Sequence, residues 1–132
     1  MATLPDLAKS WLDDPEHAVF GTVLPNGWPH LSVVWIARDG DDLLVSTVKG
    51  RRKYRNLERD PRVSVLVYPK ENPQSYVEVR GFATMTEEGG RELIDRFALK
   101  YRGLDRYTMD DGTDNVRVVV RITPEKVVFL NR

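Results

Sequence analysis

The sequence predicts a mainly β domain with a few helices, in which about six antiparallel strands form a small barrel. Three observations carry this expectation. Short runs such as 62–68 and 75–85 alternate valine with other residues, turn-forming residues separate the runs, and few segments show helical spacing. So few helices cannot cover an open sheet, and we therefore expect the sheet to close on itself and remove its edges. At 132 residues the chain fits one domain, 1–132.

The first element expected is a short amphipathic helix. Apolar residues between Leu4 and Leu12 recur at the spacing of one helical face. Thr3 stands where an N-cap residue would, and Pro5 falls in the first turn.

Three strands of a meander are expected next. The runs 17–24 and 28–38 are rich in β-branched and aromatic residues and flank the turn 25–27. The Asn-Gly pair of this turn tolerates positive φ angles, so the two runs should form a hairpin. A second turn, 39–41, leads to a third strand, 42–48.

A short helix is expected over 51–60, because this segment contains no glycine, proline or β-branched residue and Pro61 follows it. The runs 62–68 and 75–85 then alternate as half-buried antiparallel strands do.

The last third of the chain should contain one more helix and two more strands. The helix spans about 87–101, where apolar residues recur at helical spacing. The segment 103–115 has no periodicity and many turn residues, which predicts a surface loop. Two strands, 116–123 and 126–132, are expected on either side of Pro124.

Composition excludes several classes of protein. The chain is 41% apolar and 30% charged, and no apolar run is long enough to cross a bilayer. The first residues lack the basic start and apolar stretch of a signal peptide, so we expect a cytoplasmic protein without a membrane role. There is no cysteine, which excludes disulfides and thiol chemistry. His17 and His30 lack the spacing of metal ligands, and no metal site is expected.

A basic cluster follows the third expected strand, 42–48. It has five basic side chains within seven residues, although the whole chain carries 20 Lys+Arg and 20 Asp+Glu. Arg51 and Arg55 lie on one helical face, and Lys49 and Lys53 can reach over the same helix end. Free backbone N–H groups at a helix start favour an anion. We therefore expect a site for the phosphate of a small molecule.

Two other interpretations of this cluster stay open. One is a solvated helix face, which is what runs of charge commonly form. The other is a nucleic-acid patch, but the zero net charge, the pI of about 6.7 and the interleaved acidic residues argue against it.

No motif indicates catalysis by side chains. The chain has no cysteine nucleophile and no Gly-x-Ser-x-Gly turn, and neither histidine has serine and aspartate at a recognisable spacing. If the protein is an enzyme, a bound cofactor carries the reaction.

Two stretches resemble a known family. They are Asn-Gly-Trp-Pro-His-Leu-Ser-Val-Val, from Asn26, and VSTVKGRRKYRNLERDPRVSVLV, residues 45–67. Together they resemble the split β-barrel flavin and deazaflavin oxidoreductases, the superfamily of pyridoxamine 5′-phosphate oxidase-like proteins. Within it, the resemblance is to the short actinobacterial-type branch that uses coenzyme F420. The likeness spans about 17–130.

The resemblance implies a homodimer of six-stranded antiparallel split β-barrels of the FMN-binding type, with two cofactors in grooves at the subunit interface. It implies that Arg51 and Lys53 hold the cofactor phosphate, with Lys49 nearby. The other implied cofactor-binding residues are Ser32, Val33 and Val34 along the ring, Ser46, Thr47 and Val48 at the strand end, Asn56 supporting the loop, and Tyr76. Trp28 and Trp35 lie on the ring-bearing hairpin and are expected to pack in the core or at the dimer interface.

The implied function is hydride transfer from reduced F420 to an unsaturated small-molecule acceptor, with the proton coming from solvent or a nearby hydroxyl and no catalytic residue assigned. Two alternatives stay open: an FMN-binding oxidase-like enzyme, and a non-catalytic carrier of flavin, F420 or haem. The chain lacks the long C-terminal segment of true pyridoxamine 5′-phosphate oxidases, which counts against pyridoxal phosphate synthesis. The sequence does not predict the acceptor or the role of the loop 103–115.

Overall fold

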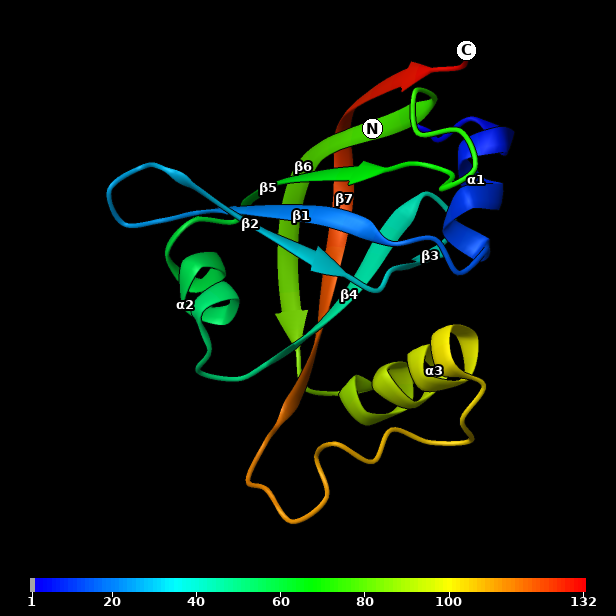
Figure 1. The fold of residues 1–132 in the computed structure, drawn as a ribbon. Coiled ribbons are helices and arrows are strands. Elements are labelled where there is room, and N and C mark those ends of the chain that lie inside the picture. Colours follow the sequence, from blue (N-terminus) through cyan, green and yellow to red (C-terminus); the bar gives the residue numbers. More distant parts are fainter. Residues whose placement is uncertain (1) are drawn as a thin grey trace.

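The computed structural model describes residues 2–132, which form a mainly β fold with three helices (Figure 1). The helices are α1 (Asp6–Asp13), α2 (Arg52–Arg59) and α3 (Gly90–Arg102). The strands are β1 (Ala18–Val23), β2 (Pro29–Val34), β3 (Ala37–Asp39), β4 (Asp42–Val48), β5 (Arg62–Val67), β6 (Tyr76–Thr86) and β7 (Arg117–Leu130).

The strands form one antiparallel sheet in the order β2-β1-β5-β6-β7-β4-β3. β6 and β7 are the longest strands, and in Figure 1 they cross behind the others, so that the sheet curves around one core. Within the described chain, the edge strands β2 and β3 are not hydrogen-bonded to each other. The predicted six-stranded barrel is therefore corrected to a curved sheet of seven strands that is not closed.

One difference in strand count arises in the predicted run 28–38, which is divided into β2 and β3. The backbone N–H of Ile36 donates to the hydroxyl of Tyr101 at 3.0 Å. Burial raises the pKa of Tyr101 to about 12, so its hydroxyl keeps its proton and donates to the carbonyl of Glu16 at 2.6 Å. The backbone N–H of Ile36 is therefore hydrogen-bonded to a side chain of α3 instead of to a neighbouring strand, and the strand is interrupted at this residue.

The other difference is at Pro124, where the two predicted C-terminal strands are one continuous strand, β7. Pro124 pairs with Gly81 where the register between β6 and β7 shifts. The shift leaves Glu125 outside the ladder, and proline is tolerated beside such a bulge because the regular hydrogen bonding is interrupted there. A Cβ atom on Gly81 would lie 2.2 Å from the carbonyl oxygen of Thr123, so the approach of the two strands requires glycine. The expectation that Pro124 separates two strands is wrong.

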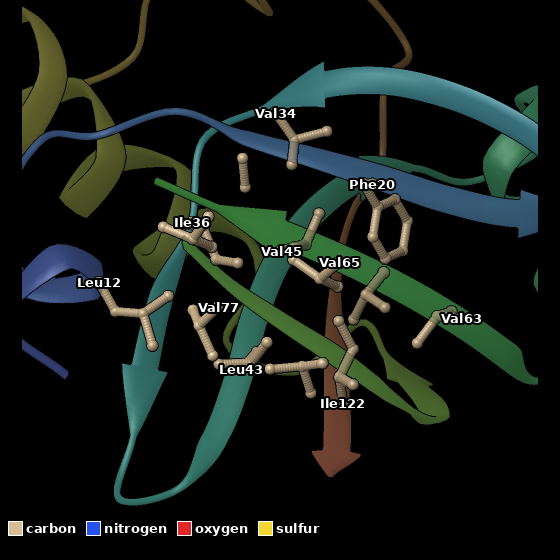
Figure 2. Packing of buried hydrophobic residues seen from close by; sticks show 14 of the residues in the cluster. Leu12, Phe20, Val34, Ile36, Leu43, Val45, Val63, Val65, Val77 and Ile122 are labelled. Carbon is tan, nitrogen blue, oxygen red and sulfur yellow. The ribbon is translucent and has the colours of Figure 1, made fainter. Parts of the chain in front are cut away.

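The core lies inside the curve of the sheet (Figure 2). Phe20 of β1, Val45 of β4, Val65 of β5 and Ile122 of β7 are all at most 1% exposed. Leu12 of α1 closes one end of the same cluster. Burying a side chain of this size contributes roughly 1.5–3 kcal/mol, so this cluster holds β4 against β1, β5 and β7.

The helices pack against the sheet through apolar side chains. α1 begins after Pro5 with no side-chain cap, so the prediction that Thr3 is the N-cap is wrong. α3 packs over β4 and β7 through a second apolar cluster that includes Ile94 and Phe97. It ends at Gly103, which has a positive φ of 67°. None of the helices in residues 2–132 is long and apolar enough to span a bilayer.

Candidate functional site

The basic cluster borders a cavity of about 390 Å³, which we call the anion cavity. It lies where β4 ends, α2 begins and β7 begins, so strand ends and a helix start converge on it. The residues that line it are His30, Ser46, Thr47, Val48, Arg51, Arg52, Lys53 and Arg117. Five predicted site residues therefore meet at one place, and no carboxylate lines the cavity.

Lys53 is the half-buried cation of this cavity. Burial lowers the pKa of Lys53, and the neighbouring Arg51 and Arg117 lower it further. Within the described chain neither Lys53 nor Arg51 has a carboxylate within ion-pair distance. Cations held together without a counter-charge are unfavourable, and a bound anion relieves the repulsion.

Arg117 is the site residue that the sequence reasoning missed. Its Nη1 lies 3.5 Å from the hydroxyl of Ser46, and its Nε lies 2.7 Å from a carboxylate oxygen of Asp110. Its guanidinium also lies over the ring of Tyr107, 4.8 Å from the centroid. The only local signal is an arginine within a valine-rich strand, and its position becomes clear only because Arg117 pairs with Val48 across β4 and β7.

A second cavity, of about 540 Å³, lies between β2, α3 and the loop 103–115; we call it the aromatic cavity. Its lining residues are His17, Val33, Val34, Trp35, Ser46, Lys53, Ile94, Phe97, Ala98, Arg102, Leu104, Tyr107, Thr108, Met109 and Arg117. Ser46, Lys53 and Arg117 line both cavities. The two cavities therefore adjoin each other, and together we call them the groove, with the anion cavity as its cationic end and the aromatic cavity as its mostly apolar end.

β2 presents unsatisfied polar atoms beside this groove. The Nδ1 atom of His30 and the Oγ atom of Ser32 are buried and have no hydrogen-bond partner within the described chain. Alternation along the strand places both on one face, and Val33, on the other face, is exposed and lines the aromatic cavity. Buried polar atoms without partners are uncommon in native proteins, and polar edges of a ligand would satisfy them.

Four predicted residues do not line either cavity. Ser32 is one of them, because its hydroxyl is buried within β2. Lys49 forms an ion pair with Glu87 at 2.9 Å, which raises the pKa of Lys49. Asn56 is buried in α2 and donates to the hydroxyl of Thr22 at 2.9 Å, which anchors α2 to β1. Tyr76 lies at the start of β6, and its cofactor contact stays a prediction.

The two tryptophans of the first hairpin have different environments. Trp35 stacks on Tyr101, with ring centroids 5.2 Å apart and planes 8° apart, and meets Phe97 and Tyr107 edge-on. This packing agrees with the expectation for Trp35. Trp28 is 71% exposed on the chain described here.

The residues of the groove suit a ligand with a phosphate and a flat ring. Arginine and lysine at the anion cavity are the side chains that bind phosphate most strongly, and the hydroxyls of Ser46 and Thr47 add polar partners. The apolar and aromatic walls of the other cavity suit a planar ring system. In residues 2–132, no group of His, Asp and Glu side chains is arranged to hold a metal ion.

Comparison with solved structures shows the same fold in other proteins. A structure described as an F420 reductase is 28% identical, with a TM-score of 0.82, over 95% of this chain and 98% of that chain. A conserved hypothetical protein from Mycobacterium tuberculosis is 25% identical, with a TM-score of 0.73, over 96% and 84% of the two chains. A putative pyridoxamine 5′-phosphate oxidase from Listeria innocua is 23% identical, with a TM-score of 0.74, over 96% and 98%, and shows the fold alone.

The comparison with curated proteins found no match. The model of the pyridoxamine 5′-phosphate oxidase family matches residues 4–131, which is nearly the whole chain. The split-barrel resemblance seen in the sequence is thus confirmed, and the chain belongs to the pyridoxamine 5′-phosphate oxidase family.

Proposed function

We propose that this protein is an F420-dependent reductase that transfers a hydride from the reduced deazaflavin to an unsaturated small-molecule acceptor. The observation that carries the proposal is the groove, in which a cationic cavity lined by no carboxylate adjoins an aromatic one and shares Ser46, Lys53 and Arg117 with it. The likeness to the F420 reductase over nearly the whole of both chains supports it.

In this proposal Arg51, Lys53 and Arg117 bind the cofactor phosphate in the anion cavity. The ring lies along β2, where Val33 and Val34 line the aromatic cavity and offer an apolar surface. The contact of Ser32 with the ring stays a prediction.

When bound, the reduced cofactor would supply a hydride for an unsaturated carbon of the acceptor, and the proton for the neighbouring atom would come from solvent or a nearby hydroxyl. The chain itself orients the reactants. The walls formed by Trp35, Phe97 and Tyr107 exclude water from the groove, and the cations fix the phosphate end. No side chain is required as a catalytic acid.

We also propose that a homodimer completes the groove. One copy of the chain exposes apolar side chains over β2 and β6: Trp28 is 71%, Leu31 63% and Phe82 47% exposed. Leu31 and Phe82 line a further groove of about 440 Å³ on this face. Apolar surface of this kind is typical of interfaces between subunits. Tyr76 lines neither cavity of its own chain, so its predicted contact requires a second subunit.

The experiment that tests the function is a titration of the purified protein with F420 and with FMN, each oxidised and reduced, followed by quenching of tryptophan fluorescence. Trp35 in the wall of the groove is the reporter. Micromolar binding of F420 without binding of FMN, together with acceptor-dependent oxidation of reduced F420, supports the proposal. Tight binding of FMN alone contradicts it.

An FMN-dependent oxidase-like enzyme is the second candidate, because the cations of the anion cavity bind any phosphate and do not distinguish the two cofactors. A carrier of flavin, F420 or haem is the third. Stable co-purified ligand without acceptor-dependent turnover would identify a carrier.

A further inference from the structure

The walls of the aromatic cavity carry positive charge and no carboxylate. Its charged lining residues are Lys53, Arg102 and Arg117, and the remaining lining is apolar, aromatic, hydroxyl-bearing or histidine. Asp110 balances the charge of Arg117, so the local excess of positive charge comes from Lys53 and Arg102. A cavity with cationic and apolar walls favours a ligand that is both flat and anionic.

Arg102 is the arginine of the aromatic cavity whose charge is not balanced by a carboxylate in the described chain. Arg91, Arg106 and Arg117 each pair with an aspartate. Arg102 forms no ion pair with any residue in the described range, although it lies at the end of α3 beside the loop 103–115. Its charge is therefore available to a ligand.

The guanidinium of Arg102 lies over the ring of Trp35, 5.4 Å from the centroid. A guanidinium stacked on an aromatic ring keeps its N–H edge free, and the stacking limits the side-chain freedom that would be lost on binding. Trp35 is held in turn by Tyr101 and Phe97. Arg102 is thus a partly preorganised donor fork at the wall of the cavity.

Arg102 is separate from the proposed phosphate site. A Cβ atom on Gly90, at the start of α3, would lie 2.1 Å from the carbonyl oxygen of Arg117, so this end of the helix adjoins the anion cavity. Arg102 is the last residue of the same helix, twelve residues further on, which corresponds to about 18 Å along its axis. It does not line the anion cavity. One phosphate bound in the anion cavity therefore does not also reach Arg102.

We propose that Arg102 binds a carboxylate of the hydride acceptor, so that the acceptor class is planar, conjugated carboxylic acids. The inference rests on the proposed function and adds the substrate class. The apolar walls contact the conjugated part of the acceptor, and Arg102 fixes its orientation relative to the ring that lies along β2. Arg102 is a specificity-determining residue in this account.

The test is calorimetric binding of two probes, 2-naphthoate and its neutral methyl ester, to protein saturated with F420 or, failing that, with FMN. The variants are Arg102→Gln, Arg102→Lys and the control Arg96→Gln. Arg96 is exposed on the same helix, lacks an ion pair in the described chain and does not line the aromatic cavity.

We expect the wild type to bind 2-naphthoate about 10- to 100-fold more tightly than the ester, as one charge-assisted pair provides. Arg102→Gln should remove this preference, Arg102→Lys should keep part of it, and Arg96→Gln should leave it intact. Steady-state kinetics with 1,4-naphthoquinone-2-carboxylate and its methyl ester should show the same pattern in kcat/KM. For each acceptor the kcat/KM of the variant is divided by that of the wild type, so the different reactivities of acid and ester cancel.

Three results would overturn the assignment: equal binding of acid and ester by the wild type, an unchanged preference in Arg102→Gln, or weakened cofactor binding in that variant with the preference unchanged. The last would place Arg102 on the cofactor. Failure of the proposed function looks different, because the wild type would then bind FMN alone or neither cofactor, whatever its preference between the probes.

Discussion

The Nε atom of Arg117 lies 2.7 Å from Oδ2 of Asp110, in an ion pair whose side chains are 12% and 7% exposed. Asn115 donates a further hydrogen bond to Asp110 at 2.9 Å. This pair connects the loop 103–115 to the first residue of β7, beside the anion cavity. This interaction therefore connects the loop beside the aromatic cavity to Arg117, which lines both cavities.

We predict that Asp110→Asn lowers the free energy of unfolding by about 1–3 kcal/mol at pH 7, because it leaves Arg117 without its charged partner. The hydrogen bond from Arg117 lowers the pKa of Asp110, so this stabilisation is present above the ordinary pKa of 3.8 and is lost as pH falls through the lowered value. Urea unfolding at pH 7 and pH 3 should show the difference between the proteins narrowing at the lower pH.

The matched control is Asp111→Asn. Asp111 pairs with Arg106, but these side chains are about half exposed, so the expected change is within about 0.5 kcal/mol. A difference between Asp110→Asn and wild type that is the same at both pH values would contradict the role of the ion pair.

Asn56→Ala should lower the free energy of unfolding by about 1–3 kcal/mol, since it leaves the buried hydroxyl of Thr22 without its partner. The same variant should weaken cofactor binding, because α2 carries Lys53 into the groove. Urea unfolding and a binding titration check the two effects. Asn72→Ala, at an exposed asparagine, serves as the control; an equal loss of stability in both variants would count against a special role for Asn56.

Gly81→Ala should be among the most destabilising single changes in the sheet, because its Cβ atom would lie 2.2 Å from a backbone oxygen. We expect a loss of more than about 2 kcal/mol, typical of overpacking against a rigid neighbour. Thr84→Ala, at an exposed position of the same strand, should change stability by less than about 0.5 kcal/mol. Similar melting temperatures for Gly81→Ala and wild type would refute the requirement for glycine at the bulge.

Leu31→Glu and Phe82→Glu should shift the protein from dimer to monomer in sedimentation velocity, because each places a charge on the proposed apolar interface. Both should also weaken cofactor binding, since the groove would lose its second wall. Leu99→Glu changes an equally exposed residue on α3, outside this face, and should remain dimeric. A wild-type protein that sediments as a monomer would contradict the proposed homodimer.

Local patterns in the sequence predict much of the fold. Alternation of valine located β5 and β6, the Asn-Gly turn located the β1-β2 hairpin, and helical spacing located α1 and α3. The errors arise where residues distant in the sequence determine the bounds of a strand. Tyr101 interrupts the strand at Ile36, and Gly81 makes Pro124 acceptable inside β7. Neither effect can be read from the neighbouring residues alone.

The candidate site was predictable to a similar extent. The basic cluster is contiguous in sequence, and its strand-helix junction placed Arg51 and Lys53 at one cavity. Arg117 could not be placed there without knowing that β4 pairs with β7. Lys49 was expected near the cofactor phosphate, but it forms an ion pair with Glu87 and does not line the anion cavity. Glu87 is distant in the sequence, so the neighbours of Lys49 do not indicate this pair.

The central claim is that the anion cavity holds the phosphate of a flavin-type cofactor. The most direct measurement compares the dissociation constants of F420 and of the deazaflavin without its phosphate, in the wild type and in the Arg51→Ala, Lys53→Ala double variant. Charged hydrogen bonds contribute roughly 1.5–3 kcal/mol each, so the wild type should bind F420 at least tenfold more tightly than the phosphate-free form, and the double variant should lose most of this difference. Equal affinities in the wild type, or an unchanged difference in the variant, would contradict the account.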